Sequence, residues 1–536
     1  MSDRGTRNWD HIVVGAGSAG AIVAARLSED PRRRVLLLEA GGAADELRFR
    51  IPAMAAMKAL GDPACDWLFM TEPDPTRNGR VDVWFRGKVL GGSSILNGTI
   101  YVRGNRGDYD HWAQLGNAGW DYRSLLGYFH RLENGTGAVA GDYGSRGPVH
   151  ITQARGAHKL AYAFIAAMAE LGVPANPHYN TDEQTGAALA HLNQHGGYRD
   201  STARAYLQPA VRRPNLTVLT HAIVRRVIFE GTRAVGVEFD QGGVTRTERA
   251  ARDIVLSASA FNSPKLLMLS GIGDPDQLRS LGIGVVHANA AVGRNLQEHP
   301  GVPIKAFVNT RTTNLDMNRL GLARLGLQWL LTNGGAATYV FPAIAFAKSD
   351  PGLQYPDLQF HFGALAQDIT PTGVKWLERP AVTLLVNVNR SSSSGHVTLR
   401  SPDPLDPPRI QPNLLVDQRE VELLKQGVRL GRRVWQTRAF APYFEAEYLP
   451  DAGQQAEAAL EEFVRREAGP SYHACGTVRM GPGDGAVVDA RLRVRGVDNL
   501  RVVDCSIIPQ VPSGNINAIS MLIGEKGAEM IKEDNA

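Results

Sequence analysis

The chain has 536 residues, with 58 Lys or Arg against 54 Asp or Glu and a net charge of +4. Its length exceeds the roughly 250 to 300 residues that one hydrophobic core serves, which predicts two joined domains, and its interspersed charges indicate no nucleic-acid partner. Its longer apolar stretches, such as residues 339–347, fall short of the roughly 18 residues that cross a bilayer, and no signal segment precedes the first predicted strand, so we expect no transmembrane segment.

Cysteine usage bears on the cellular compartment and on metal binding. Cys65, Cys475 and Cys505 are odd in number and far apart along the chain. They match neither a disulfide framework nor the ligand spacing of a zinc site. We therefore expect a cytoplasmic protein without a metal, and peripheral association with a membrane surface stays open. The sequence does not indicate an oligomeric state.

The first predicted element is a strand that runs into a glycine-rich turn, residues 12–20. Gly15 permits the turn, Gly17 lets the backbone approach a pyrophosphate, and Gly20 lets the following helix pack on the strand. The next apolar run, residues 35–38, ends at Glu39, which can accept hydrogen bonds from ribose hydroxyls. This combination predicts an adenine dinucleotide site. It suits NAD and FAD equally, and the acid disfavours NADP because it would repel a 2'-phosphate.

A second glycine-rich segment covers residues 86–98 and contains Gly91, Gly92 and Ser93. Its bare N–H groups and hydroxyls suit two different roles. The segment either begins a helix or lies against a flat polar ligand.

The middle of the chain predicts two kinds of sheet. Residues 216–219, 223–229 and 234–239 alternate apolar and polar side chains around a glycine turn, which indicates an antiparallel meander. Residues 253–258 form a continuous apolar strand typical of a parallel sheet. A helix is then predicted with Ser263 as its N-cap and Pro264 at its first position.

From residue 300 to residue 465 the pattern changes to longer strands and two helices, which predicts a second domain on an antiparallel sheet. The predicted strands are 302–308, 358–362, 382–388 and 396–399, and the predicted helices are 318–332 and 417–437.

The C-terminal stretch is expected to return to the first domain. Residues 500–504 form another apolar strand that ends in an acid, Asp504. Asn515 and Asn517 then introduce an apolar helix, and such a helix N-terminus favours an anion. Upstream lies His473, one of 14 histidines in the chain, which is a candidate general base.

Taken together, these motifs resemble the glucose-methanol-choline (GMC) flavoenzymes from end to end. The matching segments are the residue 12–20 fingerprint, residues 87–98, residues 262–273, residues 292–299, the His473 segment and residues 504–517. The resemblance implies an α/β fold with a discontinuous Rossmann-like FAD-binding domain and an α+β substrate domain on a large antiparallel sheet. The implied FAD-binding domain comprises 1–152, 196–300 and 468–536, and the substrate domain comprises 153–195 and 301–467.

The resemblance also implies oxidation of an alcohol to a carbonyl, with hydride transfer to flavin N5. His473 is the implied base for the hydroxyl proton, and its partner falls on Asn517, counting back seven residues from Gly524, with Asn515 a near competitor. An amide can bind the alcohol oxygen but cannot readily accept its proton, which leaves His473 as the base. The implied FAD contacts are Gly15, Gly17, Ser18, Ala19, Gly20, Glu39, Ala40, Val89, Gly91, Gly92, Ser93, Asn97, Gly98, Ile100, Val224, Asp504 and Asn515.

Two departures from the family pattern refine these expectations. Members that bond flavin through histidine carry it before the asparagine of the second motif, where this chain has Leu96, so we expect noncovalent FAD. Choline-type members carry a glutamate where this chain has Pro342, and burying an unpaired cation costs several kcal/mol. We therefore expect a neutral, primary alcohol, and either oxygen or a quinone as electron acceptor. Hydroxynitrile lyase-like and fatty-acid photodecarboxylase-like activities on the same scaffold stay open as alternatives.

Overall fold

The structure is a computed structural model that describes residues 9–370, 373–451, 453–454 and 456–535. Five strands form a parallel sheet in the order β10-β2-β1-β14-β28. They are β1 (His11–Val14), β2 (Val35–Leu38), β10 (Leu216–Leu219), β14 (Ile254–Leu256) and β28 (Leu500–Val502). Most of their side chains are buried, as expected for a parallel sheet that is covered on both faces.

The parallel pairing places functional candidates at one edge of this sheet. All four neighbouring pairs run parallel, so their carboxyl ends meet at the same edge. Gly15 follows β1, Glu39 follows β2, and Asp504 lies two residues after β28. The tertiary fold thus gathers three distant motifs at one place.

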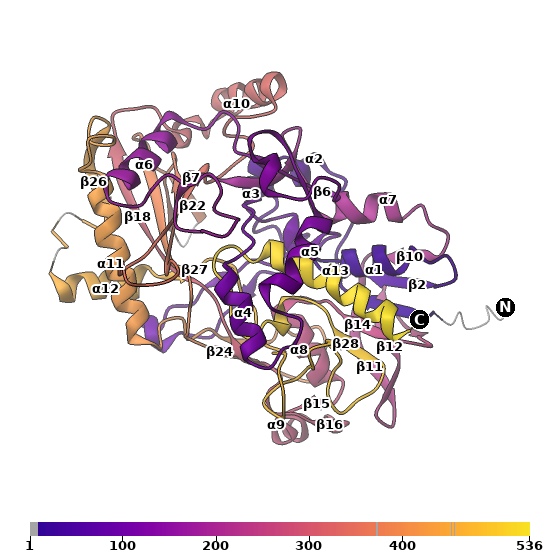
Figure 1. The fold of residues 1–536 in the computed structure, drawn as a ribbon. Helices are drawn as coiled ribbons and strands as arrows, with labels where there is room; N and C mark the ends of the chain where they lie inside the picture. The colour runs from indigo at the N-terminus through magenta and orange to yellow at the C-terminus, as the bar shows by residue number, and fades with distance from the viewer. Residues whose placement is uncertain (1–8, 371–372, 452, 455, 536) are drawn as a thin grey trace.

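Two helices from opposite ends of the chain pack beside this sheet (Figure 1). They are α1 (Gly20–Leu27) and α13 (Asn517–Asp534). Their close approach depends on Gly524, because a Cβ there would lie 2.7 Å from the Ala19 carbonyl oxygen. The C-terminal helix therefore completes the domain that the N-terminal strand begins.

The predicted meander is confirmed for residues 223–229 and 234–239, whereas residues 216–219, predicted as its first strand, form β10 of the parallel sheet. The meander consists of β11 (Ala222–Glu230), β12 (Arg233–Gln241) and β13 (Val244–Arg249), paired antiparallel in that order.

The prediction that a helix begins at Ser263 is wrong. The helix α8 spans Ser259–Leu269, with Pro264 inside it. Proline has no N–H to donate to the carbonyl four residues earlier, and here that carbonyl, Ala260 O, accepts a hydrogen bond from the Thr477 hydroxyl at 2.7 Å. Ser263 does not cap the helix but donates to Asp504 at 2.6 Å.

A second, antiparallel sheet lies on the opposite side of the molecule (Figure 1). Its order is β26-β18-β23-β20-β19-β7, and β27 pairs with β18. Its strands are β7 (Gly186–Leu189), β18 (Pro300–Val308), β19 (Ala343–Ala347), β20 (Leu358–Gly363), β23 (Ala381–Val388), β26 (Phe444–Leu449) and β27 (Gly469–Pro470). The predicted α/β fold with a large antiparallel sheet is confirmed, whereas the domain boundaries stay a prediction.

The two faces of this sheet have different partners. Helices α6 (Lys159–Glu170) and α11 (Gln418–Val434) pack against it, and alternate residues such as Ile304 and Leu384 lie against Gly431 of α11. The intervening residues face a cavity instead, so the strand alternation separates core from site. Among the described helices, none combines the length and apolar character needed to span a bilayer.

Candidate active site

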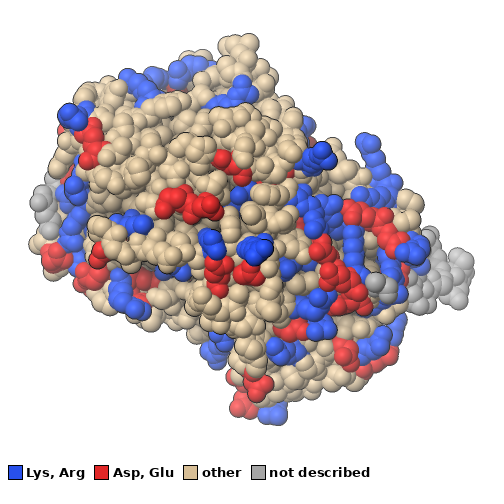
Figure 2. Space-filling view, in the orientation of Figure 1, with Lys and Arg blue, Asp and Glu red and all other residues tan. Residues whose placement is uncertain are grey.

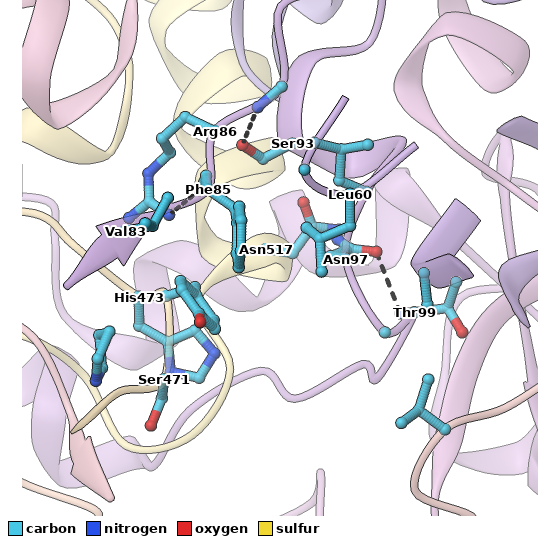
Figure 3. Close-up of a pocket in the computed structure, with 18 of the residues that line it drawn as sticks. Leu60, Val83, Phe85, Arg86, Ser93, Asn97, Thr99, Ser471, His473 and Asn517 are labelled. Atoms are coloured by element: carbon cyan, nitrogen blue, oxygen red, sulfur yellow. Dashed lines mark hydrogen bonds between the residues drawn. The ribbon is translucent and has the colours of Figure 1, made fainter. Parts of the chain in front are cut away.

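A cavity of about 1770 Å³ lies between the carboxyl edge of the parallel sheet and the free face of the antiparallel sheet. Gly15 and Glu39 line it from the first sheet, and Pro303 and His361 line it from the second. Figure 3 shows His473 and Ser471 on one side of this pocket and Asn97 and Thr99 on the other.

Most residues predicted to contact the cofactor line this cavity. They are Gly15, Gly17, Ser18, Ala19, Glu39, Ala40, Gly92, Ser93, Asn97, Gly98, Ile100, Val224, Asp504 and Asn515. The other three, Gly20, Val89 and Gly91, lie behind the wall. Gly20 packs so closely that a Cβ would lie 2.0 Å from the Gly15 carbonyl oxygen, and the Gly91 N–H donates to Ala16 O at 2.8 Å.

The two glycine-rich segments form one continuous floor. A Cβ on Gly92 would lie 2.7 Å from the Gly17 Cα, so only glycine permits this contact. A Cβ on Gly17 itself would meet nothing within 4 Å and would project into the cavity. The second segment therefore lies against the fingerprint as part of a ligand floor, while residues Gly92–Ser94 also form a short 3-10 turn.

Glu39 is held by the fingerprint itself. Its carboxylate accepts the N–H groups of Ala16 at 2.9 Å and of Gly41 at 2.8 Å. Burial raises the pKa of Glu39 to about 7. The side chain still lines the cavity, and its remaining acceptor capacity is available to ribose hydroxyls.

The residues at this end fit a dinucleotide. The open Gly17 position leaves room for a pyrophosphate at the start of α1. Asn517 lines the cavity, its Oδ1 accepts the Ser18 hydroxyl at 3.0 Å, and its Nδ2 is buried without a partner among the described residues. An unpartnered buried donor is costly unless a ligand accepts from it.

His473 is a buried residue of the cavity lining, and both of its ring nitrogens have partners. Its Nε2 lies 3.0 Å from the Asn515 Nδ2, and its Nδ1 lies 2.9 Å from the Nδ1 of His299. The sequence analysis assigned Asn517 to the position beside His473. The structure places Asn515 there instead, because Asn517 begins α13 and its amide faces Ser18.

These contacts determine which nitrogen of His473 carries the proton. The Oδ1 of Asn515 accepts from Gln359 Nε2 at 3.2 Å, which orients its Nδ2 as a donor toward His473. The Nε2 of His473 is therefore an acceptor, and the proton of the neutral ring lies on Nδ1, where His299 Nδ1 can accept it. This is the tautomer that a general base facing the cavity requires.

Burial keeps the histidines of the site neutral. Desolvation, followed by the neighbouring His299, lowers the pKa of His473 well below 6.5. It also lowers the pKa of His299 to about 3 and that of His361 to about 4. At neutral pH all three rings are therefore free bases.

The side-chain carboxylate of Glu298 binds the backbone N–H groups of His299 and His473 and so holds the two histidines together. Its Oε1 accepts the N–H groups of His299 at 2.8 Å and of His473 at 2.7 Å, and burial raises its pKa to about 7. Ligand atoms of these three residues lie within 4.8 Å of one another, close enough to hold a metal ion, although the sequence analysis predicted none. The hydrogen bonds account for their arrangement by themselves.

The cavity next to His473 is mainly apolar. Val340, Phe341, Leu365 and Leu385 are among its lining residues, and Pro342 belongs to the segment beside them.

Within the described part of the chain, every carboxylate that lines the cavity has partners in the protein. The pairs are Glu39 with Ala16 and Gly41 N–H, Asp82 with Arg80, Asp368 with Lys305, Glu467 with Arg466, and Asp504 with Ser259 N–H and Ser263. This electrostatic setting suits a neutral ligand.

Four side chains at or beside the site were not assigned a role from the sequence. His299 and Glu298 belong to a family segment, but no pattern indicated their contact with His473. His361 did carry a signal, because it follows Gln359 at the polar positions of an otherwise apolar strand. Arg199 gave no signal, yet its buried guanidinium donates to Asn97 Oδ1 at 2.5 Å.

Comparisons with known proteins agree with this geometry. Two GMC oxidoreductase models match residues 9–301 and 391–524. The mitochondrial choline dehydrogenase of Mus musculus is 41% identical over 538 residues, which covers 98% of this chain and 90% of that protein. The crystal structure of pyridoxine 4-oxidase from Mesorbium loti superposes with a TM-score of 0.89 at 32% identity, covering 98% and 99% of the two chains. The structure of an Aspergillus oryzae RIB40 formate oxidase, studied for FAD modification, superposes with a TM-score of 0.91 at 26% identity, and the match covers 98% of each chain.

Proposed function

The chain belongs to the GMC oxidoreductase family, and we propose that it oxidises a neutral primary alcohol to the aldehyde with noncovalently bound FAD. The family binds FAD and its choline dehydrogenase members act on CH–OH donors, so the chain is a flavin-dependent oxidoreductase. The observation that carries the finer proposal is the fixed tautomer of His473, whose Nε2 accepts a hydrogen bond at the apolar end of the cavity.

The FAD would lie on the glycine floor. Gly17 and Gly92 would meet its pyrophosphate region, Glu39 would accept its ribose hydroxyls, and Asn517 would donate its free Nδ2. When bound, the flavin supplies the acceptor for the hydride of the alcohol carbon. Leu96 lines the cavity and has no nucleophilic atom, which supports a dissociable cofactor.

His473 would take the hydroxyl proton. An alcohol has a pKa near that of water and does not lose its proton unaided at neutral pH. The imidazole of His473 is neutral and buried. When the alcohol binds, Asn515 can donate its hydrogen bond to the alcohol oxygen instead of to His473 Nε2, which leaves Nε2 free to accept the proton. As Nε2 accepts the proton, the Nδ1–H bond to His299 holds the ring in place.

The substrate would be uncharged. Choline is the substrate named for the mouse relative, but choline carries a quaternary ammonium. The lining carboxylates described above all have protein partners, and Pro342 offers no charge. An unpaired buried cation costs several kcal/mol, so the apolar wall of Phe341 and Leu365 favours a neutral aliphatic or aromatic alcohol.

Anaerobic mixing of the FAD-loaded protein with alcohols tests this proposal. We expect the flavin absorbance to bleach with neutral primary alcohols and much less with choline. Reoxidation by oxygen and by a quinone, measured separately, then identifies the acceptor. A flavin that no alcohol bleaches, or that choline bleaches fastest, would contradict the proposal. Release of a carbonyl compound without bleaching would indicate lyase chemistry instead.

A further inference from the structure

Helix α10 (Arg319–Thr332) exposes a cluster of leucines at the edge of the molecule. Leu320, Leu327, Leu330 and Leu331 are between 57% and 84% exposed. Figure 1 shows α10 at the top of the molecule, and Figure 2 shows that end as an uncharged projection with Lys and Arg beside it. Single exposed leucines are common, but four on one short helix indicate a binding surface.

The opposite face of α10 lines the cavity of the active site. Leu322, Leu325, Gly326 and Trp329 are lining residues, and the Trp329 indole N–H donates to Gly197 O at 3.1 Å. One helix therefore has an inner face on the cavity and an outer apolar face that no described residue covers. The outer residues 320, 327 and 331 follow the spacing of one helix stripe.

The surroundings of the leucines are basic. The sequence of α10 contains Arg319 and Arg324 and no acidic residue. The adjacent Asp316 pairs with both Arg324 and Arg311, which leaves a net positive charge in this cluster.

Two more exposed arginines lie close to the helix. Arg50 stacks over Tyr198, whose ring contacts Trp329 at 5.0 Å between centroids. A Cβ on Gly334, just beyond α10, would lie 3.2 Å from the Arg155 Cβ. The apolar stripe therefore has positive charge near both of its ends.

We propose that α10 docks the protein onto an anionic lipid surface, with Leu320, Leu327 and Leu331 inserted among the lipids and the arginines at the headgroups. An apolar stripe flanked by Arg is the pattern of helices that lie in a membrane interface. A second copy fits this surface less well, because a two-fold contact would bring the same patch, and its arginines, against itself. Docking in this way places the cavity wall formed by α10 next to the lipid.

Vesicle flotation of the full FAD-loaded chain tests the proposal. One vesicle preparation is pure phosphatidylcholine, and the other contains equal parts of phosphatidylcholine and phosphatidylglycerol. We expect binding to the mixed vesicles, weaker binding to the neutral ones, and a decrease with added salt. The Leu327→Asp/Leu331→Asp double variant should lower the partition coefficient at least about 100-fold, since each lost leucine costs about tenfold or more.

Leu405→Asp is the matched control, because Leu405 is 59% exposed but lies outside α10, and it should bind vesicles like the parent protein. All three substituted positions are on the surface, so FAD content and the melting temperature should not change. The proposal is overturned if the parent protein binds neither type of vesicle, or if the double variant binds vesicles as well as the parent protein does. If the double variant instead converts a dimer to a monomer in size-exclusion chromatography, the surface binds a second copy and the proposal is wrong.

Discussion

Replacement of His473 by alanine tests the assigned general base most directly. The ring is buried and held at both nitrogens by His299 and Asn515, so it is already oriented for proton transfer. A positioned general base contributes about 10² to 10⁴ in rate. Because both contacts are short and the ring is buried, we expect a loss near the middle of this range, about 10³-fold, or about 4 kcal/mol in the barrier.

The assay is stopped-flow reduction of bound flavin by a neutral alcohol under anaerobic conditions. His473→Ala should retain FAD, because the glycine floor and Glu39, which would hold the cofactor, are unchanged. His191→Ala is the matched control, since His191 is equally buried and bonded to Tyr143 at 2.6 Å but does not line the cavity. It should lower the melting temperature and leave the reduction rate nearly unchanged. A loss below tenfold for His473→Ala, or an equal loss for His191→Ala, would refute the assignment.

Five further results are expected. Asn515→Ala should slow flavin reduction about 5- to 30-fold, since it removes a hydrogen bond worth about 1 to 2 kcal/mol at the reacting oxygen, whereas Asn517→Ala should mainly weaken FAD binding in a titration; the reverse outcome would restore Asn517 as the partner. Because burial lowers the pKa of His473 well below 6.5, the base form persists as the pH falls, so the reduction rate should stay flat from about pH 8 to about pH 6, and a decline centred at pH 6.5 would contradict this. The same buried histidines take up protons only on unfolding, so the free energy of unfolding should decrease below about pH 6.5 in chemical denaturation. Acid precipitation should leave the flavin in the supernatant, because Leu96 forms no bond to it, and Gly17→Val should abolish FAD uptake while far-UV circular dichroism remains native.

The elements that the sequence predicted well are those with a local physical cause. The strands at 12–14 and 35–38 are continuous apolar runs, and the helices predicted at 318–332 and 417–437 became Arg319–Thr332 and Gln418–Val434. The start of the helix around Pro264 was predicted wrongly. The prediction placed proline at the first helical position, because proline inside a helix leaves the carbonyl four residues earlier without its usual N–H donor. Here Thr477 donates to that carbonyl from more than 200 residues away.

The histidines next to His473 show the same limit. His361 lies on a strand of the antiparallel sheet and His299 lies just before another. Their approach to His473 depends on pairing within the antiparallel sheet, where β27, just before His473, pairs with β18, just after His299. No spacing along the chain predicts these contacts. The polar position of His361 in an apolar strand is visible in the sequence, but it does not indicate which residue His361 contacts.

The sequence by itself determined the dinucleotide floor, because a turn between a strand and a helix needs only glycines at fixed spacing and a following acid. It also indicated that the base is a histidine, because His473 lies in one of the segments that resemble the family. Only the tertiary structure decided which amide stands beside that ring. Asn515 and Asn517 are two residues apart where a loop becomes a helix, so their side chains point to different partners, and the packing of α13 on the parallel sheet directs Asn515 to His473 and Asn517 to Ser18.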